Sequence, residues 1–387
     1  MLLSLACIAL LAGCQNEPGE PENGQQQYTM ELIPLSTHFV DIQRMGTRAD
    51  YENHLPVGYI SFNELYPTTT PPNKTIGVFM TPERESSLGD FIYQGIEDGV
   101  SIWKSTVTVI EGHEYYIYGF MPHGDADRAV ITPLPTANTS GTDRGYAEGA
   151  VLTIQNYESL TAADVCVVVG VRNATAEEKI TGPDTDIKLG SFGYLGGAVG
   201  DNRIFVLLKH IYAGIHFKAR IDPEYHRLRS IKVTNFELIA NGISEKVNLL
   251  VTFTANSTGD DPVSPTSVTY SPVGEPTSAS TTLFPWEDGP EFYEITETAP
   301  ESFLGCFVPN SCRDFVLRTT YNVYDTEGNL IREGNVAENQ INSTLIPELG
   351  NTDAGDIVTV NLLIKPSFIY VLSDPDLDNP DFKLTTP

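Results

Sequence analysis

Short runs of β-branched and aromatic residues recur along this chain, separated by residues that favour turns. The 387 residues include 18 Tyr and 17 Phe, interrupted by 32 Gly and 26 Pro. Tyr, Phe, Thr and Val suit the pleated surface of a strand, whereas Gly and Pro end or bend it. Helical periodicity is weak throughout. Spaced short strands with turn signals predict an all-β protein built from β-sandwiches.

The Gly-rich segment Gly190–Gly200 divides the chain. It lacks the Lys-Ser/Thr pair of a phosphate-binding loop, so it is interpreted as a domain junction or a cluster of turns. The sequence therefore predicts one domain over residues 28–198 and a second over 199–387. Within the second domain, Asn256–Thr282 is rich in Ser, Thr, Pro and Asp. That composition favours a long surface loop.

The strand candidate at 356–387, near the C-terminal end, alternates clearly. Its apolar side chains on one face are interrupted at Pro366, and the candidate set is Val358, Val360, Leu362, Ile364, Phe368 and Tyr370. One interpretation is the last strand of the second domain, packed in place. The other is a donor strand that leaves and completes the sheet of another subunit, as in β-augmentation. Both stay open at this stage.

Acidic residues outnumber basic ones by 51 to 23, for a formal net charge of −28. This charge disfavours nucleic acid and anionic membrane surfaces as partners. One local exception is a basic cluster comprising Lys209, Lys218, Arg220, His226, Arg227, Arg229 and Lys232. It is either an exposed strand face paired with neighbouring acids or an electrostatic dock for an acidic subunit.

Few residues point to catalysis. The seven histidines show no zinc-ligand spacing, and no Gly-x-Ser-x-Gly elbow occurs. We therefore expect no enzyme, no catalytic residues, no metal and no cofactor; His210 and His216 are expected to be structural. Cys166 lies in an apolar run and is expected to be buried. Cys306 and Cys312 are close enough in sequence for a loop disulfide, and this pairing is left open.

The N-terminal segment predicts export. Residues 1–13 form an apolar stretch too short to span a bilayer. Leu11-Ala12-Gly13-Cys14 resembles the bacterial lipobox, in which the signal is cut before the Cys and the thiol carries a lipid; the alternative is an ordinary signal peptide. Residues 14–27 contain no apolar side chain able to build a core, which is typical of a flexible acidic tether.

The first basic residues of the chain are Arg44 and Arg48. An Arg-specific protease therefore finds no earlier site in the chain. Because the predicted folded body begins soon afterwards, the Arg pair is a candidate processing site.

Together these segments resemble the fimbrillin family of Bacteroidales, the pilins of type V fimbriae. The resemblance covers nearly the whole chain after the signal. It rests on the lipobox Cys14, Thr47-Arg48-Ala49, Trp103–Ile110, Tyr115–Pro122, Leu208–Phe217 and Tyr370–Pro380.

The resemblance implies two transthyretin-like Greek-key β-sandwich domains in tandem. It also implies a fimbrial subunit at the cell outer membrane, anchored by a lipid on Cys14. Cleavage after Arg48, with Arg44 as the second choice, would remove a strand within 28–48. A donor strand from another fimbrial subunit would then fill the groove. The alternatives are a tip or accessory adhesin, or a surface lipoprotein that never polymerises and binds glycan or host protein through Trp103, Trp286, Tyr115 and Tyr116.

Overall fold

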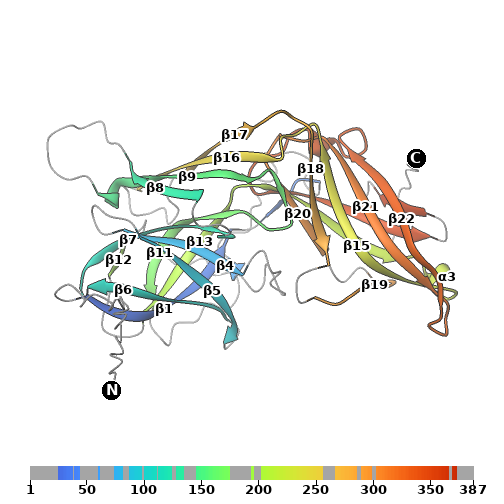
Figure 1. Ribbon diagram of the computed structural model, residues 1–387, viewed down its shortest axis with the longest axis horizontal. Coiled ribbons are helices and arrows are strands. Elements are labelled where there is room, and N and C mark those ends of the chain that lie inside the picture. The colour runs from blue at the N-terminus through green and yellow to red at the C-terminus, as the bar shows by residue number, and fades with distance from the viewer. Residues whose placement is uncertain are drawn as a thin grey trace, which may run out of the picture.

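The computed structural model is built almost entirely of strands, which confirms the all-β expectation (Figure 1). It describes residues 25–37, 39–43, 60–61, 74–81, 87–97, 100–110, 112–123, 128–134, 145–174, 193–195, 202–255, 266–285, 289–298, 302–365 and 368–372. Among these residues, no helix is long and apolar enough to cross a bilayer.

The N-terminal part contains a closed ring of strands. Its sheet runs in the order β11 (Cys166–Ala174), β13 (Arg203–His210), β1 (Gln25–Ser36), β6 (Val100–Ile110), β5 (Ser87–Glu97), β4 (Thr75–Thr81), β7 (Glu114–Met121) and β12 (Gly193–Leu195), and β3 (Ile60–Ser61) also pairs with β1. Pairing of β7 with β11 closes the ring. Alternate side chains of these strands fill its interior, among them Met30, Val78 and Trp103.

A second sheet covers one side of the ring. It comprises β8 (Ala129–Pro133), β9 (Gly149–Glu158), β16 (Lys246–Thr254) and β17 (Thr266–Val273). In Figure 1 this sheet lies above the ring, on the left of the molecule. Outward-facing residues of the ring pack against it, and Phe205, Leu152 and Phe253 share the resulting core.

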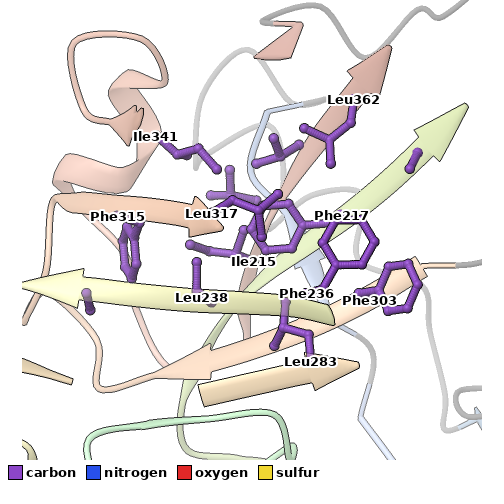
Figure 2. Close-up of a cluster of buried hydrophobic side chains, with 14 of the residues drawn as sticks. Ile215, Phe217, Phe236, Leu238, Leu283, Phe303, Phe315, Leu317, Ile341 and Leu362 are labelled. Atoms are coloured by element: carbon purple, nitrogen blue, oxygen red, sulfur yellow. The ribbon is translucent and has the colours of Figure 1, made fainter. Parts of the chain in front are cut away.

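The C-terminal sandwich, on the right of Figure 1, packs two further sheets face to face. One holds β10 (Leu160–Thr161), β20 (Ser302–Phe307), β14 (Ala213–Ile221), β23 (Asp356–Lys365), β2 (Val40–Asp41) and β24 (Phe368–Leu372). The other holds β18 (Ser278–Phe284), β15 (Ser230–Asn241), β21 (Asp314–Tyr324), β22 (Leu330–Asn342) and β19 (Tyr293–Ile295). Figure 2 shows their shared core, in which Phe217 and Leu362 from one sheet meet Phe236 and Leu317 from the other.

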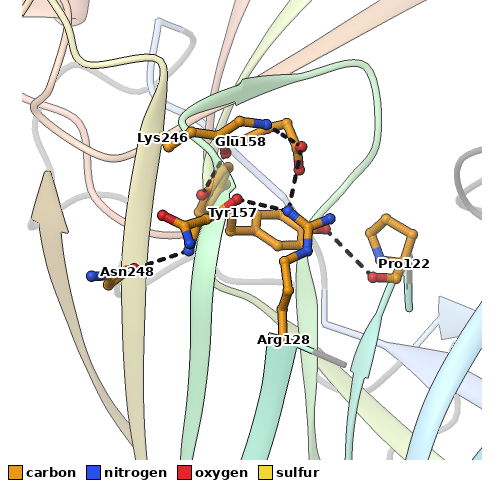
Figure 3. A network of polar contacts seen from close by, with 8 residues as sticks. Pro122, Arg128, Tyr157, Glu158, Lys246 and Asn248 are labelled. Carbon is orange, nitrogen blue, oxygen red and sulfur yellow. Dashed lines mark hydrogen bonds and ion pairs between the residues drawn. The ribbon is translucent and has the colours of Figure 1, made fainter. Parts of the chain in front are cut away.

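Polar contacts fasten β16 to β9 (Figure 3). The Lys246 ammonium lies 2.6 Å from the Glu158 carboxylate. The Asn248 side chain accepts a hydrogen bond of 2.9 Å from the backbone N–H of Asn156, at a bulge in the pairing. Asn156 has a φ of 53°, a left-handed conformation that Asn tolerates well. These contacts fix the register between strands that are distant in the sequence.

One segment that the sequence predicts to be a loop forms strands instead. The segment Asn256–Thr282 was expected to be a loop, but it contributes β17 and most of β18, because alternate Ser and Thr side chains suit the exposed face of a strand.

The sheets combine strands from both sides of residue 199: β13 pairs with β1 and β11, and β16 pairs with β9. The domain boundaries and the transthyretin-like arrangement stay predictions.

Candidate functional site

The predicted removable strand is a core strand of the ring. β1 pairs antiparallel with β6 on one edge and parallel with β13 on the other. Its side chains alternate: Met30 and Leu32 point into the ring, whereas Ile33 and Leu35 pack toward the covering sheet. All four are at most 2% exposed. The strand begins at Gln25, inside the segment predicted as a tether. Both edges and both faces of β1 are therefore occupied.

Glu31 joins β1 to both neighbouring strands. Its carboxylate lies 2.8 Å from the Arg203 guanidinium of β13 and 3.0 Å from the Lys104 ammonium of β6. Arg203 and Lys104 are the residues directly opposite Glu31 in the two pairings. Burial alone would raise the pKa of Glu31, but hydrogen bonds from Lys104 and Arg203 outweigh burial and lower it. The ion pairs thus favour the charged carboxylate while β1 is in place.

After β1 the chain crosses to the C-terminal sandwich. Val40 and Asp41 form β2, which pairs parallel with the start of β23. The Ile42 side chain packs against the sandwich core. We call the described residues 25–37 and 39–43 the N-terminal strap, because they bind the ring at one end and the sandwich at the other.

The strap also covers one edge of β23. The backbone N–H of Thr359 donates to the side-chain oxygen of Gln43 at 2.8 Å, and its hydroxyl lies 3.3 Å from the Asp41 carboxylate. Further along the same edge, β24 pairs with Asn361–Lys365. The other edge is filled by β14 in parallel pairing. The strap and β24 therefore share the edge of β23 opposite β14.

His210, at the end of β13, contacts both parts of the strap, at Thr37 and at Phe39. Its Nδ1 lies 2.8 Å from the Asp164 carboxylate, and its Nε2 lies 2.9 Å from the Thr37 carbonyl oxygen. Both ring nitrogens thus face an oxygen within hydrogen-bond distance. The ring also stacks on Phe39 at 3.8 Å between centroids. A buried histidine, hydrogen-bonded to a buried aspartate, thus anchors the strap.

Cys166 completes this buried cluster. Its Sγ lies 3.1 Å from the Asp164 carboxylate and 3.4 Å from the His210 Nδ1. Burial raises the pKa of the Cys166 thiol well above its usual value, and the Asp164 charge raises it further. The thiol therefore stays protonated and donates to Asp164. In a nucleophilic triad the thiol and the carboxylate contact opposite ring nitrogens, whereas here both contact Nδ1.

The same three side chains are the most compact candidate for a metal site. Their donor atoms lie within 4.8 Å of one another, but no fourth His, Cys or carboxylate joins them among the described residues. A structural zinc site normally has four ligands. Hydrogen bonding alone accounts for the observed separations. The sequence analysis did not identify this cluster. Its one local signal is Asp164, an acidic residue just before the apolar strand β11.

Several predicted site residues lie outside the described part of the chain: Cys14, Arg44, Arg48 and Trp286. In the candidate donor segment, Val358, Val360, Leu362 and Ile364 are at most 4% exposed in the sandwich core. Phe368 and Tyr370 belong to β24, and their side chains are not described.

Other candidates are dispersed. Trp103 and Tyr115 are buried within the ring and Tyr116 packs against the neighbouring core, so they do not make an exposed stacking platform. Cys306 and Cys312 are both free thiols, not a disulfide. The basic cluster also divides: Lys209 lies on β13, and Lys218 and Arg220 lie on β14. His226, Arg229 and Lys232 line one pocket at the start of β15.

No protein-family model matches the chain, and no curated protein sequence matches it. Among solved structures, it is similar to a candidate cell adhesion protein of Bacteroides uniformis, with 10% identity over 94% of this chain and 99% of the other and a TM-score of 0.35. A candidate cell adhesion protein of Bacteroides fragilis is 12% identical over 93% of this chain and 99% of the other, with a TM-score of 0.36. A fimbrial protein of Bacteroides vulgatus is 10% identical over 92% of this chain and 98% of the other, with a TM-score of 0.31. Likeness at these scores carries no argument about function.

Proposed function

We propose that the chain is a structural subunit of a cell-surface fimbria, exported as a lipoprotein and assembled by protease-triggered strand exchange. The observation that supports this proposal is the place of β1, an N-terminal strand paired on both edges and buried on both faces. A lipid on Cys14 would hold the precursor at the outer membrane. An Arg-specific protease would cut after Arg48, or after Arg44, and the whole N-terminal strap lies before either cut.

Loss of the strap would leave a groove in the ring. Backbone groups of β6 and β13 would lose their partners, and the apolar side chains that pack against Met30 and Leu32 would meet water. A strand from another subunit restores both kinds of contact if its apolar residues recur with period two. Apolar burial supplies about 25 cal/mol per Å². Because the displaced strap is no longer attached, exchange becomes one-way.

The donor follows from how tightly each C-terminal strand is held. β23 belongs to the sandwich core, so we assign Val358–Ile364 a resident role. β24 pairs with β23 and with no other described strand. We therefore propose β24, with Phe368 and Tyr370, and the chain after it as the donor segment. Release of the strap would also uncover the start of β23 beside it.

Native digestion tests the trigger. The purified chain is incubated with an Arg-specific protease, followed by N-terminal sequencing and electrophoresis in SDS without boiling. We expect a new N-terminus at Ala49, or at Met45, and a ladder of SDS-resistant oligomers. The double variant Arg44→Ala/Arg48→Ala should stay uncut and monomeric. Arg227→Ala, an exposed arginine beside the short helix α3 (Pro223–His226), is the matched control and should behave as wild type.

A second variant tests the donor. A chain that ends at residue 367 keeps β23 but lacks β24. It should be cut normally and form no ladder. Ladders from this shortened chain would exclude β24 as the donor, and an intact wild-type chain after digestion would exclude the Arg trigger.

A further inference from the structure

A surface pocket of about 340 Å³ lies at the end of the C-terminal sandwich that carries α3, on the lower right of Figure 1. It is lined by His226, Arg229, Ser230, Lys232, Glu294, Tyr324, Asp325, Thr326 and Gly328. Its volume is at the lower end of the range of roughly 300–1,000 Å³ for small-molecule sites. That size suits a single ring-shaped ligand.

Strand register places the polar groups of the pocket on the outer face of the sheet. Ile231 is buried, so its neighbours Ser230 and Lys232 point outward. Ser230 is opposite Tyr324 of β21, and Lys232 is opposite Glu294 of β19. Residues directly opposite each other share a face. The floor of the pocket therefore presents a hydroxyl, an ammonium, a carboxylate and an aromatic ring together.

The Lys232 ammonium is held in position by aromatic rings. Its Nζ lies 4.1 Å from the Phe292 ring centroid and 4.7 Å from the Tyr324 ring centroid. Within the described part of the chain, it forms no ion pair with a carboxylate. Cation–π contacts fix the position of the charge but satisfy none of its N–H donors. The pocket thus offers an oriented cation to a ligand.

The hydrogen bonds of the nearby acid Asp325 go to its own turn and not to Lys232. Asp325 accepts hydrogen bonds from the backbone N–H groups of Glu327 and Asn329, at 2.9 and 2.8 Å, and from the Asn329 side chain at 3.0 Å. These bonds, led by that of the Asn329 side chain, lower the pKa of Asp325. Asp325 is therefore committed to its own hairpin turn. Glu294 is exposed and is the carboxylate that remains to accept a hydrogen bond from a ligand.

We infer that this pocket binds a carboxylate-bearing sugar, a hexuronic acid unit of an acidic glycan. Lys232 and Arg229 pair with the ligand carboxylate, and Glu294 and Ser230 bind its hydroxyls. A phosphate ion has no ring hydroxyls to donate to Glu294 and Ser230, whereas a neutral sugar leaves Lys232 unpaired. The inference goes beyond fimbrial assembly and does not depend on it, because every residue involved lies in the C-terminal sandwich.

Calorimetric titration of the full chain tests the inference, with glucuronate as the probe. Glucose has the same ring with a hydroxymethyl group in place of the carboxylate, and inorganic phosphate tests for simple anion binding. We expect millimolar binding of glucuronate and at least tenfold weaker binding of glucose and phosphate. Equal binding of glucose, tighter binding of phosphate, or no glucuronate binding in the millimolar range overturns the assignment.

Variants locate the site. Lys232→Met keeps the aliphatic stem between the rings and should weaken glucuronate binding about tenfold, the worth of one charged hydrogen bond. Lys246→Met removes a lysine on β16, outside the pocket, and should leave binding unchanged. Undiminished binding by Lys232→Met overturns the site. The titration is repeated with the Arg44→Ala/Arg48→Ala variant, which should stay uncut and monomeric. Glucuronate binding should be unchanged in this variant, so a failure of binding is distinguished from a failure of assembly.

Discussion

The Nε2 atom of His210 lies 2.9 Å from the carbonyl oxygen of Thr37, the residue that follows β1. The two residues are 173 positions apart in the sequence. On the other side of the ring, Asp164 accepts a hydrogen bond from Nδ1. The strap therefore leaves the ring at a point fixed by a buried histidine whose two ring nitrogens both have partners. A buried hydrogen bond contributes little net stability when made, but a buried polar group left without its partner is costly.

Replacing this histidine should loosen the strap. His210→Phe keeps a flat ring beside Phe39 but removes the hydrogen-bond partner of the buried Asp164 carboxylate and of the Thr37 carbonyl. Because two buried polar groups lose a partner, we expect the free energy of unfolding to fall by about 3 kcal/mol. Urea denaturation followed by tryptophan fluorescence measures the loss.

The control for this variant is His226→Phe. His226 is partly exposed and lies 3.0 Å from the Glu297 carboxylate at the surface. Its replacement should change the free energy of unfolding by about 0.5 kcal/mol or less. If the two variants lose the same stability, His210 has no special role in anchoring the strap.

The Glu31 ion pairs should make the strap sensitive to acid. Because the folded-state pKa of Glu31 is lowered, its contribution is present above the unfolded value of 4.5 and is lost as the pH falls through the folded pKa. The site is partly exposed, so Glu31→Gln should cost only about 0.5–1 kcal/mol at pH 7. The difference between wild type and variant should close below pH 4.5.

Denaturant titrations at several pH values test this expectation. Glu97→Gln is the control, since Glu97 is more exposed and lies 3.6 Å from the same Lys104 ammonium. Its effect should be smaller at every pH. A Glu31→Gln difference that persists undiminished in acid would contradict the ion-pair explanation.

How far the sequence predicts this fold depends on the range of each contact. The period-two alternation of Val358, Val360, Leu362 and Ile364 identifies a buried strand without a structure. The strand around Leu32 and Leu35 shows no such alternation and was expected only from the resemblance to fimbrillins. The parallel pairing of β1 with β13 could not be predicted, because strands so distant in sequence carry no local signal for each other. The closure of the ring by β7 and β11 is missed for the same reason.

The polar cluster around His210 illustrates the same limit at a site. Cys166 was interpreted as an apolar residue because its neighbours are Val, and its burial agrees. Its hydrogen bond to Asp164 is local, but the third member, His210, comes 44 residues later and meets it only through β11–β13 pairing. The basic residues of the pocket, His226, Arg229 and Lys232, are by contrast close in sequence, and the sequence analysis did group them. What the sequence could not predict is which members of the basic cluster lie on the same face of the sheet.

His216, in the sandwich, should make the stability of the protein depend on pH. Burial, and to a smaller extent the Lys218 charge, lower the pKa of His216 to about 4. Because the unfolded state takes up the proton first, stability should fall as the pH drops from 6.5 toward 4 and then level off. His216 is only half-buried by surface exposure, so we expect a loss of about 1–2 kcal/mol.

His216→Gln should remove this loss and flatten the stability profile over that pH range. Thermal unfolding at fixed ionic strength measures it, with His113→Gln, at an exposed turn, as the control. A variant whose profile matches that of wild type would rule out His216 as the titrating group.

Two glycines with nearly the same φ angle allow backbone strain to be separated from crowding. Gly149 and Gly95 have φ values of 128° and 127°, which disfavour any side chain. A Cβ at Gly149 would collide with the carbonyl oxygen of Phe253 on β16, whereas a Cβ at Gly95 meets nothing within 4 Å. Gly95→Ala should cost about 1–2 kcal/mol from conformation alone. Gly149→Ala should cost about 2 kcal/mol more, because β9 and β16 must separate locally.

Urea denaturation of the two variants gives the comparison directly. Hydrogen exchange of the Thr254 amide, opposite Gly149, should quicken in Gly149→Ala and stay unchanged in Gly95→Ala. Equal stability losses would mean that β16 moves aside at no cost. The pairing of β9 with β16 would then be easier to deform than the close approach of Gly149 to Phe253 indicates.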